Sequence, residues 1–453
     1  MTLSSQPSRT LLVRWAALTA SALALLAALP AHAAIPIEHW THASGARVYL
    51  VPSPSIPMLD VQVDFDGGSR RDPARQAGLA SATAGLLSGG VAAQGGQPAL
   101  DENQLSEAWV DLGAQFGAQA GTDRFSVSLR TLTEPELLDR AVALAARQLA
   151  APAWPERVWQ RDRERMLASL KEAENRPGTL AGRAFARAVY GGHPYGQQTD
   201  AATLQAIGVA DMQAFYRRHV VACRAQVTMV GAIDRARADR MVSQLMAAVQ
   251  PHGCAPLPSV PEVPDLPRAV EQRLPFDAAQ AQVLIGQPGI ARDHPDFFPL
   301  FVGNYILGGG GFVSRLTTEV REKRGLSYSV YSYFSPGRHA GAFQIGLTTR
   351  PDQAAQAVDV SREVVRNFVA QGPTEAELQA AKAFLINGFA LRIDSNRKLL
   401  DNVANIAWNG LPLDYLDTWT DQVRRVSVAD IRRAFAQAIR PERMVTVVVG
   451  AKP

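Results

Sequence analysis

The sequence predicts an α+β fold made of two homologous domains, each an antiparallel-rich sheet covered by helices. Three observations support this class. About 420 residues remain after an N-terminal leader, which is more than a single hydrophobic core usually fills. The second half of the chain repeats the first at low similarity. In each half the patterns run strand, strand, helix, strands, two or three long helices and a last strand.

The leader occupies residues 1–33 and has the features of a secretory signal peptide. Arg9 and Arg14 form a basic segment, residues 15–29 are apolar, and residues 31–33 (Ala-His-Ala) form a cleavage box. A transmembrane anchor is the alternative, but the apolar run is shorter than about 20 residues and is followed by small residues and a proline. No cysteine follows the box, which argues against a lipoprotein. We therefore expect a periplasmic protein with no membrane span after signal removal.

The charge pattern gives no sign of a nucleic-acid partner. Removal of the leader takes away two arginines and no acidic residue, so the formal charge of +4 falls by two. The basic residues alternate with acidic ones along the expected helices, as they do on solvated faces. No Lys/Arg run with interleaved aromatics occurs. We expect no nucleic acid among the partners.

The two cysteines, Cys223 and Cys254, are a candidate disulfide because an exported protein folds in an oxidising compartment. Such a bridge would close a loop of about 30 residues and contribute roughly 3 to 4 kcal/mol in the chain-entropy model. Two buried free thiols are the alternative.

The internal repeat is clearest at the end of each half. Residues 209–211 (Val-Ala-Asp) open a helix that leads to a strand ending in residues 230–232 (Val-Gly-Ala). Residues 428–430 (Val-Ala-Asp) lead in the same way to residues 449–451 (Val-Gly-Ala), with a constant offset of 219 positions. Two homologous domains are the economical explanation.

An earlier part of the repeat and a proline-rich stretch complete the domain prediction. The strand of residues 61–65 is followed by an Arg-Asp-Pro loop, and the strand of residues 281–285 is followed by Arg-Asp-His-Pro at residues 292–295. Residues 256–267 are rich in proline and have no periodicity, which is typical of a linker. The predicted domains are residues 34–255 and 269–453, joined by a linker of residues 256–268.

A helix in the first half carries a resemblance to a known family. The loop of residues 67–73 leads into a helix of residues 78–89 that is rich in Gly, Ala and Ser. This segment resembles the one in which the pitrilysin/insulinase metallopeptidases, or inverzincins, carry His-x-x-Glu-His. There two histidines bind zinc and the glutamate activates water. By this resemblance the motif positions here are Ser81, Ala84 and Gly85, which cannot replace imidazole or carboxylate groups at a zinc site.

The family's third zinc ligand is a glutamate on a later helix, which the stretch of residues 162–170 resembles. The resemblance gives Ser169 as the ligand position, with Glu164 and Glu172 as the alternatives if the alignment is shifted. A lone glutamate would not rebuild the site, because both histidines are missing as well.

No other metal or catalytic site stands out. None of the eight histidines lies four residues from another, and His39 and His42 are expected on opposite faces of a strand. No Gly-x-Ser-x-Gly elbow, reactive-cysteine context or Ser-x-x-Lys signature occurs. We interpret Ser81 and its small neighbours as residues that let their helix pack closely against the sheet. We expect no metal and no catalytic residue in this chain alone.

The second half contains a glycine run, residues 308–311, followed by the stretch Val-Arg-Glu-Lys-Arg-Gly-Leu-Ser-Tyr from residue 320. The glycines lack the Lys-Ser/Thr ending of a P-loop, so a flexible turn is the expectation. The following run resembles the C-terminal motif of the pitrilysin family, whose arginine and tyrosine lie seven residues apart and contact substrate at the zinc of another domain or subunit. They would be Arg321 and Tyr328 here, an ion-pairing residue and a strand residue on residue type alone.

The resemblance also implies how a peptide would bind. The family has an edge strand after the motif helix that pairs with the peptide backbone, and residues 112–118 resemble it. The candidate binding residues on this strand are Gln115, Phe116, Gly117 and Ala118. Strand addition of this kind tolerates many substrate sequences.

Taken as a whole, the chain is similar to the zinc-less subunit of a heterodimeric bacterial member of the family, with a pitrilysin-like (LuxS/metallohydrolase-like) fold. The resemblance implies a non-catalytic, substrate-binding subunit whose zinc-bearing partner hydrolyses peptides or unfolded proteins. Zinc is expected on the partner and no cofactor on this chain. A structural or scaffold relative without a role in proteolysis is the alternative, and an autonomous zinc protease is opposed by the missing ligands.

Overall fold

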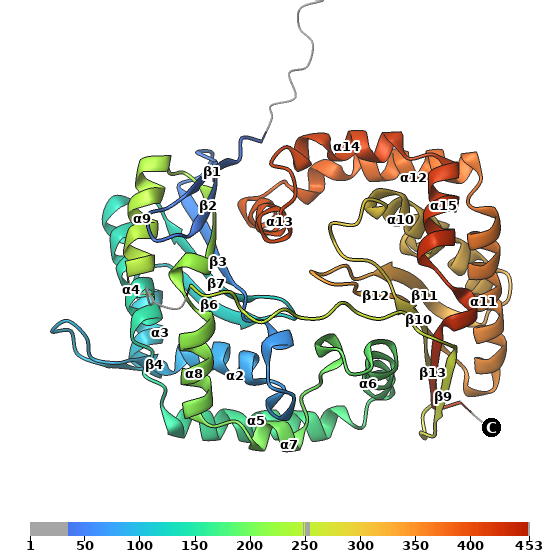
Figure 1. Ribbon diagram of the computed structural model, residues 1–453, viewed down its shortest axis with the longest axis horizontal. Coiled ribbons are helices and arrows are strands. Elements are labelled where there is room, and N and C mark those ends of the chain that lie inside the picture. Colours follow the sequence, from blue (N-terminus) through green and yellow to red (C-terminus); the bar gives the residue numbers. More distant parts are fainter. Residues whose placement is uncertain (1–34, 248, 250–253, 452–453) are drawn as a thin grey trace, which may run out of the picture. The chain divides into compact units, whose positions relative to one another are not determined.

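Two mixed sheets with their helices make up the fold in the computed structural model (Figure 1). The structure describes residues 35–247, 249 and 254–451, so the expected signal peptide (residues 1–33) lies outside the described residues. The predicted α+β class is confirmed. No helix within the described ranges is both long and apolar enough to cross a bilayer.

The first half forms a six-stranded sheet in the order β1-β2-β8-β3-β7-β6. Its strands are β1 (Glu38–Thr41), β2 (Arg47–Pro52), β3 (Met58–Phe65), β6 (Gln115–Ala120), β7 (Phe125–Leu132) and β8 (Gln226–Gly231), with a separate ribbon of β4 (Gly90–Val91) and β5 (Leu100–Asp101). Its helices are α2 (Leu79–Leu86), α3 (Glu102–Asp111), α4 (Pro135–Ala150), α5 (Glu156–Ala173), α6 (Pro177–Tyr190), α7 (Ala201–Gln205), α8 (Val209–His219) and α9 (Arg235–Ala247).

The second half forms a five-stranded sheet in the order β11-β12-β10-β13-β9. Its strands are β9 (Val270–Leu274), β10 (Ala281–Pro288), β11 (Ser327–Phe334), β12 (Ala342–Thr349) and β13 (Val445–Val449). Its helices are α10 (Phe297–Asn304), α11 (Ala354–Gln371), α12 (Glu375–Asn387), α13 (Asn396–Asn409), α14 (Tyr415–Arg425) and α15 (Val428–Ala438), with π-helical turns η6 (Tyr305–Gly309) and η8 (Thr317–Glu322).

The two sheets have the same topology. Strands β2, β8, β3, β7 and β6 correspond in order to β9, β13, β10, β12 and β11, and β1 is an addition at one edge. In both sheets only the pair at the β2 or β9 side is parallel, β2 with β8 and β9 with β13. The last strand of each series, β6 or β11, is an edge strand.

Helices α8 and α15 show how the repeated sequence produces repeated structure. They begin at Val209 and Val428 and end at His219 and Ala438, so both ends keep the offset of 219 positions. Each begins with an aspartate at its third position whose carboxylate accepts a hydrogen bond from the backbone N–H three residues earlier. These bonds satisfy donors that the first helical turn leaves free.

Each sheet buries one face under the helices of its own half. In the first half the alternate β3 residues Leu59, Val61, Val63 and Phe65 join a core with α2, α4, α8 and α9. In the second half Val283 and Ile285 of β10 join a core with α10, α11, α12, α14 and α15. This alternation leaves the opposite face of each sheet for other partners.

Those opposite faces are covered by exchanged helices. Helix α6, from the first half, packs on β10 and β13 of the second sheet, and its counterpart α13 packs on β3 and β8 of the first (Figure 1). Ala181, Phe185 and Val189 lie four residues apart on α6 and contact the valines of β13. The β-carbon that a residue other than glycine would bring to position 286 would approach Phe185 within 2.9 Å and a backbone oxygen within 2.0 Å, so this crossing is close.

The linker region contacts both halves. The ring of His193, which follows α6, lies 2.8 Å by its Nε2 from the backbone oxygen of Pro261. His339, in the β11–β12 loop, lies 2.9 Å by its Nδ1 from the carboxylate of Glu262. Between them Tyr195 donates a hydrogen bond to Asp123 and accepts one from the backbone N–H of His339. Polar side chains thus hold the linker, and its Val263 and Leu266 add apolar contacts.

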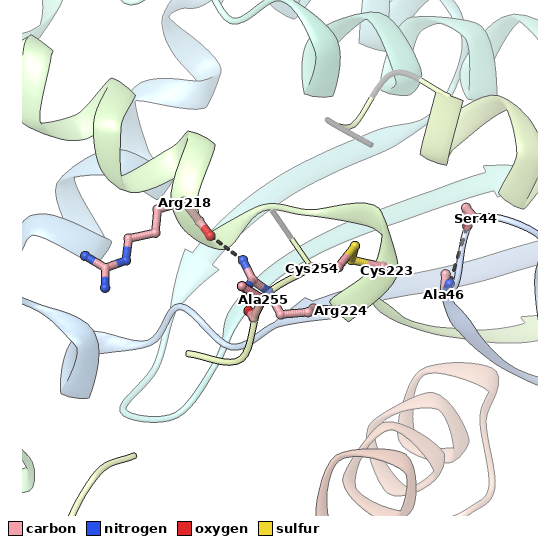
Figure 2. Close-up of a disulfide and its surroundings, with 7 residues drawn as sticks. All are labelled: Ser44, Ala46, Arg218, Cys223, Arg224, Cys254 and Ala255. Carbon is pink, nitrogen blue, oxygen red and sulfur yellow. Dashed lines mark hydrogen bonds between the residues drawn. A yellow bond between two sulfur atoms is a disulfide. The ribbon is translucent and has the colours of Figure 1, made fainter. Parts of the chain in front are cut away.

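A disulfide joins Cys223 and Cys254, whose Cα atoms lie 6.0 Å apart (Figure 2). Cys223 follows α8 and packs against Gly45 in the β1–β2 turn, where a β-carbon would come within 2.9 Å of it. Arg224, the next residue, donates a hydrogen bond of 2.9 Å to the backbone oxygen of Ala255 and another to that of Arg218. The start of the linker is thus attached to the first half by covalent and polar contacts.

Candidate functional site

The motif of the second half brings Arg321 and Tyr328 together. Arg321 lies on the π-helical turn η8, and Tyr328 lies near the start of edge strand β11. Between them Gly325 adopts a left-handed conformation with φ of 61°, and its N–H donates to the backbone oxygen of Arg321 over 2.9 Å. Glycine adopts this conformation without strain, so it ends the helical turn and directs the chain into the strand.

The guanidinium of Arg321 contacts two aromatic rings. Its Cζ is 4.8 Å from the centroid of Tyr328 and 4.7 Å from that of Phe312. Both rings are largely exposed, Tyr328 by 82% and Phe312 by 68%. Cation–π contacts of this geometry hold a guanidinium in place without occupying its hydrogen-bond donors. Phe312 precedes the motif in the sequence, and no sequence pattern marks it as part of the site.

Arg321 has no ion-pair partner in the part of the chain that the structure describes. The nearby Glu319 pairs with Lys323 and Arg324, at 2.7 and 2.6 Å. A hydrogen bond from Arg315 lowers the pKa of Glu377 to about 2, and the two side chains form an ion pair of 2.7 Å. The ion-pairing role expected on residue type is therefore wrong for Arg321. Neither its N–H groups nor the phenol of Tyr328 has a hydrogen-bond partner among the described residues.

The glycine run spans the end of one helical turn and the start of the next, and its first residue is closely packed, whereas a β-carbon at Gly311 would meet nothing within 4 Å. Gly308 and Gly309 end the π-helical turn η6, which packs on β11. A β-carbon at position 308 would come within 2.6 Å of the backbone of Ser332, so a residue with a side chain would push the turn away from the strand. π-Helical turns are rare and often occur at functional sites; Arg321 lies on one, and the other packs on β11, the strand of Tyr328.

In the first half, the residues at the degenerate motif positions lie on α2. Ser81 and Gly85 are exposed, and a β-carbon at Gly85 would meet nothing within 4 Å. Ala84 is buried, as are Ala80 and Ala82. The interpretation that small residues allow close packing is therefore correct for the alanines and wrong for Ser81 and Gly85, because those two positions face open space.

Helix α2 begins at a buried carboxylate. Asp72 accepts hydrogen bonds from the backbone N–H groups of Gly78 and Ala80, at 2.8 and 2.9 Å. Burial raises the pKa of Asp72 to about 6, although these hydrogen bonds oppose the shift. An ionised carboxylate at this end of a helix also interacts favourably with the helix dipole. Asp72 thus fixes the start of α2 and the direction of its exposed face.

Other candidate ligands lie apart from one another. Ser169, Glu164 and Glu172 are exposed on α5, and Glu172 pairs with Arg176. His39 stacks on Tyr49, whereas His42 lies between Ser44 and Ser243. No group of three His, Cys, Asp or Glu side chains suited to a metal ion occurs among the described residues.

Strand β6 contains the candidate peptide-binding residues Gln115, Phe116, Gly117 and Ala118. It pairs with β7 on one side only and forms the edge of its sheet. Helix α2 packs beside it, and Phe116 stacks on Trp109 of α3. The edge strand therefore lies next to α2.

Comparisons with known proteins agree with this architecture. Residues 206–385 match the family model described as the peptidase M16 inactive domain. The non-peptidase homolog YmxG of Helicobacter pylori is 26% identical over 388 residues, which are 83% of this chain and 85% of that protein. A crystal structure titled as the peptidase M16 inactive domain from Pseudomonas fluorescens is 31% identical, with a TM-score of 0.86, and the alignment covers 92% of this chain and 98% of that one.

A third comparison shows the fold alone. The periplasmic protease PqqL from Escherichia coli is 17% identical with a TM-score of 0.77, and the alignment covers 94% of this chain but 47% of that protein. The fold and its exposed motif helix define a metallopeptidase-type chain. More particularly, the chain belongs to peptidase family M16, the pitrilysin/insulinase family. Its sequence contains no two histidines four residues apart, so the family's paired zinc-binding histidines are missing.

Proposed function

We propose that this chain is a non-catalytic, substrate-binding subunit that acts with a zinc-bearing M16 partner to hydrolyse peptides or unfolded proteins. The observation that carries the proposal is the pair of a half-buried Arg321 and an exposed Tyr328, held in contact while their side-chain donors have no partner among the described residues. A scaffold protein has no need of a guanidinium held against two exposed rings with its donors unpaired.

The chemistry of the pair suits a transition state formed on another subunit. Water attack on a peptide carbonyl produces an oxyanion, and N–H and O–H donors aimed at it lower the barrier. Charged donors such as guanidinium are the stronger ones. In this chain Arg321 would bind the carbonyl oxygen and Tyr328 would donate through its phenol, while zinc and the attacking water belong to the partner.

Two further observations support a pair of subunits. PqqL is about twice as long as the region that this chain matches, so a protein of that length has room for two such units in one chain. The edge strand β6 offers unpaired backbone groups to an extended peptide. Periplasmic location is part of the proposal, and the disulfide between Cys223 and Cys254 supports it because such bonds persist in oxidising compartments.

The test is peptide hydrolysis by the purified mature chain, alone and mixed with a zinc-bearing M16 protein exported by the same cell. We expect activity and stoichiometric zinc only in the mixture. Arg321→Ala or Tyr328→Phe should lower turnover by about a hundredfold or more, the usual effect of losing an oxyanion donor. Arg324→Ala and Tyr331→Phe are matched controls, because Arg324 pairs with Glu319 and Tyr331 lies further along β11.

Each other outcome has a definite meaning. Zinc and activity in the chain alone would show that the ligand assignment is wrong. A mixture that is no more active than the partner alone would favour the alternative, a structural relative without a role in proteolysis. Equal losses in the Arg321 and Arg324 variants would indicate a general effect of charge instead of a specific donor.

A further inference from the structure

An aromatic cavity lies beside α10, away from the Arg321 pair. It has a volume of about 320 Å³, near the lower end of the range for small-molecule pockets of about 300 to 1,000 Å³. Phe297, Leu300, Phe301 and Asn304 line it at helical spacing, so one face of α10 forms its wall. Tyr333 and Phe334 of β11 and Asn405 of α13 line it from other elements.

The cavity contains a cation that no carboxylate neutralises. Arg292 lines it, with the guanidinium 3.8 Å from the centroid of Phe297 and one N–H donating to the phenol of Tyr415 over 2.6 Å. Arg292 forms no ion pair with any residue that the structure describes. A guanidinium has five N–H donors, and stacking on a ring fixes its plane while leaving its edge available for a bidentate acceptor.

The internal repeat provides a direct comparison. The loop after β3 contains Arg71, and the corresponding loop after β10 contains Arg292. Arg71 forms an ion pair of 2.7 Å with Asp66 and lines none of the cavities described here. The second copy lacks the carboxylate partner and has aromatic walls instead.

The two asparagines that line the cavity differ in their hydrogen bonds. Asn304 is bonded through both side-chain atoms to Ser332, whereas Asn405 has no side-chain hydrogen bond within the described part of the chain.

We propose that this cavity binds the C-terminal residue of a peptide that ends in an apolar or aromatic side chain. The ring would contact Phe297, Phe301 and Tyr333, and the terminal carboxylate would accept hydrogen bonds from Arg292, with Asn405 at the rim. Offset or edge-to-face contacts between rings favour an aromatic residue, and the charged bond favours a free carboxylate over an amide. The identification of the occupant as a peptide depends on the proposed function, but the binding itself does not require a zinc-bearing partner.

The experiment is calorimetric titration of the mature chain alone with N-acetyl-Gly-Phe, its C-terminal amide and N-acetyl-Gly-Lys. We expect the free acid of the phenylalanine peptide to bind about tenfold or more tightly than the other two, as the loss of a hydrogen bond to a charged group predicts. Arg292→Met should weaken binding of the acid by about the same factor and leave binding of the amide unchanged. Arg433→Met is the matched control, because Arg433 pairs with Asp296 in the same half.

A second variant protects the test against misfolding of the first. Asn405→Asp introduces a negative charge at the rim without touching the contacts of Arg292, and it should also weaken binding of the acid. Equal affinity for acid and amide, or an unchanged affinity in Arg292→Met, would overturn the proposal. Equally tight binding of 3-phenylpropionate would overturn the peptide assignment in favour of a free aromatic acid. Hydrolysis is not measured, so failure here leaves the test of the Arg321 pair intact.

Discussion

Helices α6 and α13 pack at equivalent positions on the two sheets, but the sheet face under α6 is mainly apolar and the face under α13 is polar. The face under α6 consists of the β13 residues Val445, Val447 and Val449 with their neighbours, all buried among apolar side chains. The face under α13 contains the β3 residues Asp60, Gln62 and Asp64, which are buried as well. The same topology therefore gives one contact that is mainly apolar, with Gln282 beside Gly178 of α6, and one that buries several polar side chains.

The polar contact is incompletely satisfied. Neither carboxylate oxygen of Asp60 has a hydrogen-bond partner among the described residues, and Thr228 of β8 and Asn396 of α13 also retain unpaired polar atoms. Arg130 is the nearest paired cation, 3.7 Å from Asp60. Unpaired buried polar groups cost about 1 to 3 kcal/mol each. We therefore expect the contact of α6 with its sheet to be more stable than the contact of α13 with the other sheet.

The largest expected effect tests the contact of α6 with its sheet. Phe185→Ala removes a buried ring from the contact between α6 and β13 and should lower the free energy of unfolding by about 3 to 5 kcal/mol. Denaturant unfolding followed by circular dichroism measures this loss. Phe384→Ala is the matched control, because that ring is 62% exposed, and it should change stability by less than about 0.5 kcal/mol. Similar losses in both variants would contradict the idea of a stable apolar contact under α6.

The second prediction tests whether the loss of unfolding free energy at low pH arises mainly in the first half of the chain. His219 of α8 is buried, its Nδ1 lies 2.8 Å from the backbone oxygen of Asp66, and burial lowers its pKa to about 4. The unfolded chain, with a pKa near 6.5, binds more protons between pH 4 and 6.5. Stability is therefore lost as the pH falls through this window, by about 3 kcal/mol in total.

Asp72 opposes this trend, because its raised pKa makes stability fall as the pH rises from about 4 to about 6. The measurement is therefore the difference in unfolding free energy between His219→Asn and the parent at pH 7 and pH 4. We expect the difference to shift by about 3 kcal/mol in favour of the variant at the lower pH. His39→Asn, at an exposed position, is the control. A constant difference across pH would show that His219 does not carry the acid sensitivity.

The smallest expected change in stability concerns the polar sheet face under α13. Burial raises the pKa of both Asp60 and Asp64, but only Asp64 accepts hydrogen bonds, from Gln62 at 2.8 Å and from Ser126 at 2.5 Å. Asp64→Asn should cost about 1 to 3 kcal/mol at pH 7, whereas Asp60→Asn should be neutral or stabilising by up to about 1 kcal/mol. Thermal unfolding at pH 7 compares the two. A larger loss for Asp60→Asn would mean that its ion pair with Arg130 outweighs the cost of burying the carboxylate.

The sequence predicts the two repeated halves well, but it says little about the contacts between them. The constant offset between residues 209 and 428 predicts helices that the structure confirms at both ends. Periodicity shows that α6 and α13 have apolar faces, yet it cannot show that each face covers the sheet of the other half. Exposure at Ser81 and Gly85 was missed because small residues are equally common at tight contacts and at open surfaces. The contact of Phe312 with Arg321 depends on a π-helical turn, which alters the spacing expected of an α-helix.

The exchanged helices also constrain the order in which the chain can fold. Helix α6 leaves the ribosome long before β13, whose residues 445–449 lie close to the C-terminus, so the valines that Phe185 contacts on that strand are absent until synthesis is almost complete. Contacts between distant parts of a chain form slowly, and an uncovered apolar helix face invites aggregation in the meantime. A nascent chain of this design gains from being kept unfolded until its last strand has emerged. Loss of that one strand would therefore uncover part of the apolar face of a helix made more than half a chain earlier.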